Sequence, residues 1–173
     1  MTSLRAMTIS DLPRVLEIIG EAQAFLAAQN INQWQNGYPN EETMRSDIEK
    51  EQSYVSTVDN QTVGMMTIVF DGEPSYRTIY DGAWSAVVPY ACIHRMAIGG
   101  SFRGGKTADE MIRAAEALVI KKGFRYIRVD THRENQRMQR MLFRNRFLRC
   151  GVIYLSEGLE ANDERIAFDK VLV

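Results

Sequence analysis

The residues best suited to chemistry lie in the middle of the chain, between Ile93 and Ala108. The apolar stretch Ile93–Ile98 is followed by a small, basic, glycine-bearing turn at 102–106, which leads directly into a predicted helix. Free backbone N–H groups and the positive end of the helix dipole would point at whatever lies over this turn. The order of elements therefore predicts an anion site, and a phosphate group is the expected ligand.

The helix after the turn is predicted over 106–122. Lys121 and Lys122 fall in its last turn, where cations complement the helix dipole, and Gly123 is a candidate C-cap. Apolar residues recur at three- and four-residue spacing, so the helix should pack one face on a sheet. That apolar stripe consists of Ala108, Met111, Ile112, Ala115, Leu118 and Val119.

Further elements follow in the same half of the chain. A strand is predicted at 126–131, a second amphipathic helix begins near Asn135, and another strand covers about 150–155. Strand, phosphate turn, helix and strand in this order indicate a parallel crossover unit. Dinucleotide folds and nucleoside triphosphate loops also use glycines between a strand and a helix, but the glycine spacing here matches neither fingerprint.

The turn resembles the signature of the GNAT superfamily of N-acetyltransferases. In that family an apolar strand is followed by Arg/Gln-x-x-Gly-x-Gly/Ala at the start of a helix, and Arg103 and Ala108 match the first and last positions. Lys106 stands where the family usually has glycine, so the turn must either tolerate a side chain there or shift by one residue and use Gly105. Lys106 could also add a direct charge contact to a phosphate.

The resemblance continues downstream through 130–138 and extends to Phe147. In the family's segment after the strand an asparagine, here Asn135, opens the next helix near the cofactor. Leu142 departs from the pattern, because many members carry at that position a tyrosine that protonates the leaving thiolate. Arg146 also departs from it, in place of the usual glycine before Phe147. The resemblance therefore implies the cofactor site without its common general acid.

This resemblance implies a single α/β domain over residues 1–173. Its mixed central sheet would have about six or seven strands with helices on both faces, and a splayed pair of parallel strands would hold coenzyme A, with acetyl-coenzyme A as the co-substrate. The strand backbone at 96–98 would contact the pantetheine arm and the oxyanion. The cofactor-binding residues that the resemblance assigns are Met96, Ala97, Ile98, Arg103, Gly104, Gly105, Lys106, Thr107, Ala108, Asn135 and Met138.

Acetyl transfer to an amine requires a proton acceptor, because a lysine-like amine has a pKa of about 10.4 and must be neutral to attack. His94 is the first candidate, since it lies three residues before Ala97 and an ordinary histidine pKa of about 6.5 suits this task. His132 is the second candidate, and a structural role is the alternative for both. Tyr154, on a late strand, is a candidate replacement for the missing general acid, with packing as its alternative.

Aromatic residues suggest where an acceptor would bind. Trp34 and Tyr38 lie in a loop rich in glycine, proline and asparagine, where the family places a lid on the acceptor side. Trp84 is a third candidate for acceptor binding, although core packing explains it better. Six arginines between 133 and 149 are consistent with a solvated helix face or with binding to a phosphate of coenzyme A or of nucleic acid.

The N-terminal half contains the remaining predicted elements. A short strand is expected up to about Ile9, followed by a helix from Asp11, with Ser10 or Asp11 as its cap. A second helix is expected from Glu41, capped by Asn40. Strands are predicted at 54–58, 63–70, 90–98 and 166–171, the first two joined by a turn near 59–60.

The composition of the chain limits the classes of fold and function that are compatible with it. A chain of 173 residues with 45% hydrophobic content can bury one substantial core, and a net charge of −1 gives no general argument for nucleic-acid or membrane binding. Cys92 and Cys150 are too few for a disulfide framework or zinc site and are expected to be inert buried thiols in a reducing compartment. No apolar run is long enough to cross a bilayer and no signal-peptide core is evident, so a cytoplasmic location is expected.

The sequence thus predicts an N-acetyltransferase that transfers an acetyl group from acetyl-coenzyme A to a primary amine of a small molecule or peptide. We expect direct attack in a ternary complex, with no nucleic acid, membrane or metal involved. Edge strands could support a homodimer. The alternative is an acyl-coenzyme A sensor or interaction domain with little or no catalysis, because Lys106 and Leu142 depart from the family pattern.

Overall fold

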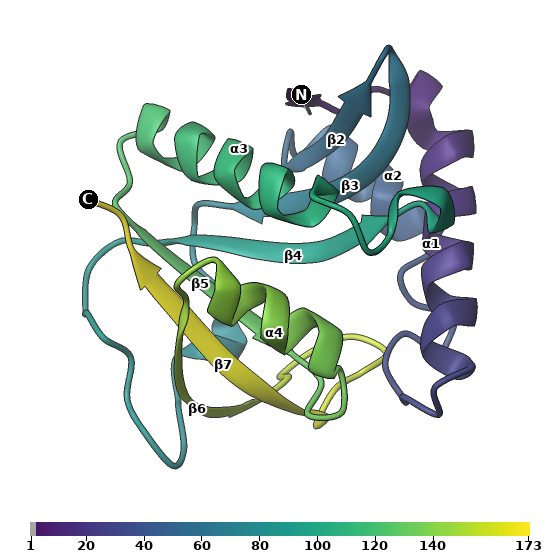
Figure 1. Cartoon of the computed structure of the whole chain (residues 1–173). Coiled ribbons are helices and arrows are strands. Elements are labelled where there is room, and N and C mark those ends of the chain that lie inside the picture. Colours follow the sequence, from purple (N-terminus) through teal and green to yellow (C-terminus); the bar gives the residue numbers. More distant parts are fainter. Residues whose placement is uncertain (1–2) are drawn as a thin grey trace. The chain divides into compact units, whose positions relative to one another are not determined.

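A computed structural model describes residues 3–173, which contain seven strands and four α-helices (Figure 1). Every predicted strand and helix is present, with small shifts at the ends. The strands are β1 (Ser3–Ala6), β2 (Ser53–Val58), β3 (Gln61–Val69), β4 (Ala91–Ile98), β5 (Tyr126–Thr131), β6 (Leu148–Tyr154) and β7 (Glu164–Val171). The helices are α1 (Leu12–Ala27), α2 (Glu41–Glu49), α3 (Thr107–Lys121) and α4 (Gln136–Arg144).

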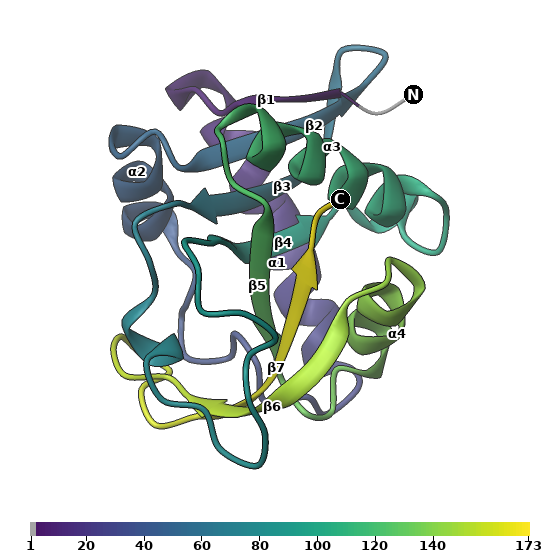
Figure 2. The ribbon, with the colours of Figure 1, turned by 90° about the vertical axis from the view of Figure 1, so that its left-hand side faces the viewer.

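Hydrogen bonding orders the strands β1-β2-β3-β4-β5-β7-β6. β4 runs parallel to β5, with residues 91–93 of β4 in register with 127–129 of β5. β1 and β3 pair antiparallel with β2, and β7 lies between β5 and β6, antiparallel to both (Figure 2). The predicted mixed α/β fold and the parallel crossover from β4 through α3 to β5 are therefore confirmed.

The chain divides into two compact units. The first comprises the chain up to Ile68 together with His94–Ala115, and the second comprises Val69–Ile93 together with Glu116–Val173. β4 and α3 each contribute residues to both units. The strand end and turn that were predicted to bind phosphate belong to the first unit, whereas the α4 region belongs to the second.

The first unit is built on one apolar cluster from α1, α2 and the strands. Asp59 and Asn60 both take left-handed φ angles, of 48° and 62°, which is the geometry of a two-residue hairpin turn and confirms the predicted turn between β2 and β3. The core residues are Met7, Leu12, Val15, Ile18, Ile19, Leu26, Ile31, Trp34, Met44, Val55, Met65 and Ala97.

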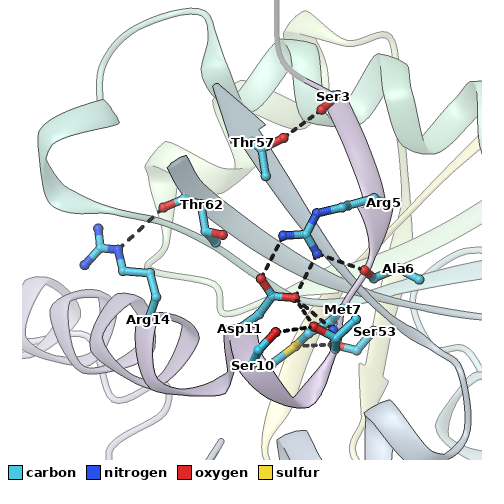
Figure 3. Close-up of polar contacts among 11 residues, drawn as sticks. Ser3, Arg5, Ala6, Met7, Ser10, Asp11, Arg14, Ser53, Thr57 and Thr62 are labelled. Carbon is cyan, nitrogen blue, oxygen red and sulfur yellow. Dashed lines mark hydrogen bonds and ion pairs between the residues drawn. The ribbon is translucent and has the colours of Figure 1, made fainter. Parts of the chain in front are cut away.

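The N-terminal strand is shorter than predicted, because it ends at Ala6 and a 3-10 turn occupies Ile9–Asp11. The Asp11 carboxylate accepts a hydrogen bond from the backbone N–H of Thr8 at 2.9 Å and a two-point contact from Arg5, with both distances 2.8 Å (Figure 3). These bonds bend the chain after Ala6, so the strand cannot continue to Ile9. α1 then begins at Leu12 rather than at Asp11.

The second unit contains β5, β6, β7 and α4, with a cluster that includes both cysteines. Cys92 and Cys150 are free and buried, as predicted. Burial, followed by a hydrogen bond to Asp169, raises the pKa of the Cys150 thiol to about 12, so this thiol stays protonated at neutral pH. Across residues 3–173, none of the helices combines the length and the apolar character needed to span a membrane.

Candidate cofactor and acceptor site

The predicted phosphate turn joins β4 to α3 in the first unit. After β4 ends at Ile98, a 3-10 turn covers Gly100–Phe102 and α3 begins at Thr107. Gly104 takes a left-handed φ of 82°, whereas Lys106 lies outside that region of backbone conformation. The backbone at Lys106 therefore needs no glycine, whereas the backbone at Gly104 takes a conformation that favours one.

Arg103, the first residue of the motif, is held by two contacts. Its Nε donates to the carbonyl oxygen of Ile98 at 3.2 Å, and its guanidinium lies 4.6 Å from the centre of the Phe25 ring. Within residues 3–173 its buried Nη2 has no hydrogen-bond partner. A buried donor without a partner is costly, so an anion that reached Nη2 would remove that cost.

α1 anchors the other side of the turn (Figure 1). The Glu21 carboxylate accepts the backbone N–H of Gly100 and pairs with Arg14 at 3.2 Å. The Gly100 N–H lowers the pKa of Glu21, burial opposes this effect, and Arg14 and Arg103 lower the pKa further. Gly100 is thus fixed by the protein itself, which leaves the later residues of the turn and the first N–H groups of α3 as donors for a ligand.

The last five residues of β4 carry the first candidate base and the predicted backbone contacts. His94 is half-buried, as are Met96 and Ile98, whereas Ala97 is buried. Arg95 takes a left-handed φ of 48° inside this strand. Residues other than glycine seldom take a left-handed φ, and such a residue breaks the alternation of side chains along a strand. The backbone of β4 is therefore irregular where the cofactor contacts were predicted.

Arg95 is the centre of a buried polar cluster that the sequence did not reveal. Its Nε and Nη2 contact Asp47 Oδ2 and Oδ1 at 2.7 and 2.8 Å, and its Nη1 donates to the Tyr38 hydroxyl at 2.6 Å. Thr67 Oγ1 donates to Asp47 Oδ2 at 2.8 Å. Burial lowers the pKa of Arg95, but Tyr38 and Asp47 more than offset this, so its pKa lies above the ordinary value.

The two loop aromatics have different positions. Trp34 is 8% exposed and belongs to the core cluster of the first unit, with a left-handed φ of 63°. Tyr38 is half-buried, packs against that cluster and presents its hydroxyl to Arg95. Gln23 of α1 holds this loop by donating to the carbonyl oxygens of Tyr38 and Pro39, both at 3.2 Å. The loop before α2 is therefore attached both to α1 and to β4.

The predicted α4 residues lie in the second unit. Asn135 caps the helix, because its side-chain oxygen accepts the backbone N–H of Met138 at 3.2 Å. Both residues are half-buried. Leu142 is fully buried in the same helix, so the position of the family's tyrosine is here part of the core.

The other two aromatic candidates are also in the second unit. Tyr154 is 46% exposed, and its ring makes an edge contact with Tyr80. Trp84 donates its indole N–H to the carbonyl oxygen of Tyr76 at 3.1 Å and lies 4.3 Å from the Arg128 guanidinium. These contacts account for Trp84 by packing, while nearly half of the Tyr154 surface is exposed.

His132, the second candidate base, organises the turn before α4. Its Nδ1 accepts the backbone N–H of Glu134 at 3.2 Å. Burial lowers the pKa of His132, and the nearby Arg165 charge lowers it further. The imidazole is therefore neutral at physiological pH, and one of its two nitrogens already has a structural role.

Comparisons with known proteins show the family of the chain and its fold. Residues 21–146 match the model of the Acetyltransferase (GNAT) family, and the chain therefore belongs to that family. It is accordingly an acyltransferase, and acetyl-coenzyme A is the donor that the family uses. No curated protein sequence matches the chain.

Solved structures share the fold along almost the whole chain. A GNAT-family acetyltransferase from Streptococcus agalactiae is 26% identical with a TM-score of 0.87, covering 99% of this chain and 96% of that one. A GNAT-family acetyltransferase from Listeria monocytogenes is 18% identical with a TM-score of 0.74, covering 99% and 95%. The PaiA N-acetyltransferase from Thermoplasma acidophilum, solved in complex with coenzyme A, is 16% identical with a TM-score of 0.70, covering 99% of each chain.

Proposed function

We propose that this protein transfers an acetyl group from acetyl-coenzyme A to a primary amine by direct attack in a ternary complex. The turn after β4 is the observation that supports acetyl-coenzyme A as the acetyl donor. There the buried Nη2 of Arg103 has no hydrogen-bond partner among the described residues, and α3 begins at Thr107. A pyrophosphate offers the negative charge and the oxygen acceptors that such a turn requires.

In this proposal the donor binds along the end of β4 and over the turn. Gly104 and Gly105 let the phosphates approach the backbone, and Lys106 adds a positive charge beside the N-terminus of α3. The backbone at Met96 and Ile98 contacts the pantetheine arm and the thioester. We assign the remaining cofactor-binding positions to Thr107, Ala108, Ala97, Asn135 and Met138.

The chemistry follows from the needs of acyl transfer. The neutral amine nitrogen attacks the thioester carbonyl carbon, and the developing oxyanion accepts hydrogen bonds from backbone N–H groups of β4. Collapse of the intermediate breaks the C–S bond, forming the amide and the coenzyme A thiolate. We assign the proton taken from the amine to His94 and the proton given to the thiolate to Tyr154, because Leu142 offers no acid.

We assign acceptor binding to Trp34, Tyr38 and Trp84, with a small amine or a peptide amine as the acceptor. Tyr38 is the strongest of the three, because its half-buried ring lies in the loop attached to β4 through Arg95. Trp34 and Trp84 would act by shaping the surface around a ligand, since both are well packed.

The test is calorimetric titration with acetyl-coenzyme A, with dephospho-coenzyme A and ATP as controls, followed by a panel of primary amines with detection of the released thiol. Saturable binding that prefers the full cofactor, with thiol release that depends on one class of amine, supports the proposal. Binding without amine-dependent release across the panel would argue against acetyl transfer to a primary amine. Folded protein that binds none of the three nucleotides would overturn the donor assignment.

A further inference from the structure

Arg95 occupies an energetically costly conformation in the middle of β4. Its φ of 48° is left-handed, and a non-glycine residue stays in that region only where the surrounding structure determines it. The side chain explains why this conformation persists, because residues of α2, of β3 and of the loop before α2 hold the guanidinium. The side-chain contacts of Arg95 therefore hold its backbone in the left-handed conformation.

The contacts are specific and buried. Asp47 of α2 binds the guanidinium at two points, with the Asp47 side chain 6% exposed and that of Arg95 15% exposed. Thr67 of β3 donates to the same carboxylate and lies 3.3 Å from Arg95 Nε. A planar two-point arginine–carboxylate pair fixes orientation as well as distance, and its strength increases away from water.

The contacts of Arg95 with Asp47 and Tyr38 are called the clamp below. The strand geometry after Arg95 shows what the clamp controls. The backbone N–H of Gly99 donates to the carbonyl oxygen of Val63 in β3 at 2.9 Å. Because successive residues of a strand face opposite sides, the N–H groups of Met96 and Ile98 face away from β3. The Ile98 carbonyl accepts a hydrogen bond from Arg103 Nε, in the turn after β4, which agrees with this assignment.

We propose that Asp47, Arg95 and Tyr38 form a positioning device that fixes the left-handed turn of β4 and so aims the backbone N–H groups of Met96 and Ile98 at the thioester carbonyl. Tyr38 connects the same clamp to the loop before α2, so acceptor binding at that loop and alignment of the strand are mechanically linked. The inference rests on the proposed function, which assigns those N–H groups to the thioester.

The clamp makes a prediction that needs no acceptor. Coenzyme A and acetyl-coenzyme A share every phosphate and differ in the acetyl thioester. A change that misaligns Met96 and Ile98 should weaken binding of acetyl-coenzyme A more than binding of coenzyme A, because both ligands share the phosphates and the pantetheine arm and only the first has a thioester carbonyl. General loosening of the first unit would instead weaken both ligands equally.

The main variant is the double substitution Asp47→Leu with Arg95→Met, which removes both charges and leaves no buried charge without its partner. Tyr38→Phe removes only one hydrogen bond and serves as the milder second variant. Arg45→Met is the matched control, because Arg45 pairs with Glu41 on the exposed face of the same helix. Each protein is examined by thermal unfolding, by calorimetry with both ligands, and by amide hydrogen exchange at Gly99.

We expect the double variant to lose at least fivefold in the ratio of acetyl-coenzyme A to coenzyme A affinity, with at least tenfold faster exchange at Gly99. Tyr38→Phe should shift the ratio in the same direction by about twofold, and Arg45→Met should leave it unchanged. An unchanged ratio in a folded double variant overturns the proposal, as does equal weakening of both ligands. If the double variant does not fold, an unchanged ratio in Tyr38→Phe overturns it.

Failure of the proposed function would look different. If the wild-type protein binds neither ligand, the donor assignment fails, and the exchange measurement alone then decides whether the clamp fixes β4. Unchanged exchange at Gly99 in the folded double variant would reject the clamp in that case. Faster exchange there, with the Arg45→Met control unchanged, would retain the clamp as a determinant of the strand backbone.

Discussion

The guanidinium of Arg103 lies over the ring of Phe25, 4.6 Å from its centre. Phe25 is in α1, so a helix far away in sequence holds the first residue of the phosphate motif in place. Arg103 Nε is also engaged by the Ile98 carbonyl, which leaves Nη2 oriented without a partner among the described residues. A preorganised donor costs less to use than one that must first be ordered.

Phe25→Ala should therefore weaken acetyl-coenzyme A binding about three- to fivefold, the size expected for one exposed cation–π contact. Calorimetry on the variant measures the change. Phe143→Ala is the control, because Phe143 is exposed on α4 and contacts Phe168 rather than an arginine. Equal affinity in wild type and Phe25→Ala would mean that the ring does not position Arg103 for the cofactor.

Gly104 and Gly105 should respond differently to substitution. Gly104 has a φ of 82°, so Gly104→Ala should cost about 1 kcal/mol of stability through backbone strain and weaken the cofactor site as well. At Gly105 an added Cβ would meet only the Phe102 carbonyl oxygen, at 4.0 Å. Gly105→Val should therefore leave stability nearly unchanged while lowering acetyl-coenzyme A affinity about tenfold by crowding the phosphates.

Gly158→Ala provides the control for strain alone, because Gly158 has a φ of 81° with open space around it in a loop of the second unit. It should reproduce the stability cost of Gly104→Ala in denaturant unfolding without any loss of affinity. Undiminished cofactor affinity in Gly105→Val would mean that the phosphates do not approach the backbone at this residue.

His94→Ala tests the assigned base once an amine substrate is known. Without the imidazole the reaction depends on hydroxide or on the rare neutral amine, so the deficit relative to wild type should be largest at low pH and shrink at high pH. The measurement is the pH profile of thiol release for both proteins, with His132→Ala as the control. A small loss that is uniform across pH would assign His94 a structural role.

The sequence predicted the elements well where single residues mark their ends. Asn40 caps α2 by accepting the Thr43 N–H at 3.0 Å, and Asn135 caps α4 in the same way. Gly123 ends α3 with a left-handed φ of 89°. Such local signals act over three or four residues, so they can be recognised without knowing the fold.

The buried clamp was missed because its parts are distant in sequence. Asp47 and Arg95 are 48 residues apart, and Tyr38 and Arg95 are 57 apart. In the sequence Arg95 only interrupts an apolar strand, and nothing local indicates a left-handed residue. One signal was available, because Asp47 falls three residues after Met44 on the buried face of α2, where a carboxylate needs a partner.

The Arg5–Asp11 pair predicts acid sensitivity at the N-terminus. The hydrogen bond from Arg5 lowers the pKa of Asp11 to about 2, against the opposing effect of burial and with further help from Thr8. Because the pKa is lower in the folded than in the unfolded chain, the carboxylate stabilises the fold above its ordinary pKa of 3.8, and this contribution is lost as pH falls toward 2. The contribution is at most about 2 kcal/mol at neutral pH.

Asp11→Asn should accordingly be less stable than wild type at pH 7, with a difference in unfolding free energy that disappears near pH 2. Denaturant unfolding at several pH values measures it. Glu17→Gln is the control, because Glu17 is an exposed acid of α1. If the difference between wild type and Asp11→Asn stays constant from pH 7 to pH 2, the pair does not lower the pKa of Asp11 in the folded protein.

At the end of α4 the effect of backbone conformation on stability can be separated from the effect of charge. Arg146 follows the helix with a left-handed φ of 64°, at the position where the family usually has glycine. A side chain in this conformation is strained, so Arg146→Gly should raise the unfolding free energy by about 1 kcal/mol, although the more flexible unfolded chain offsets part of the gain.

Arg149→Gly makes the same chemical change in β6, where Arg149 pairs with Phe168 of β7 and has no left-handed φ, and where glycine weakens the strand by roughly 0.5 to 1 kcal/mol. The two variants should therefore move the unfolding midpoint in opposite directions in urea. A shift in the same direction for both would show that loss of positive charge from the arginine-rich segment, rather than the conformation at Arg146, determines the effect. Because both variants lose one exposed arginine, the comparison cancels the charge contribution and leaves the cost of the left-handed residue.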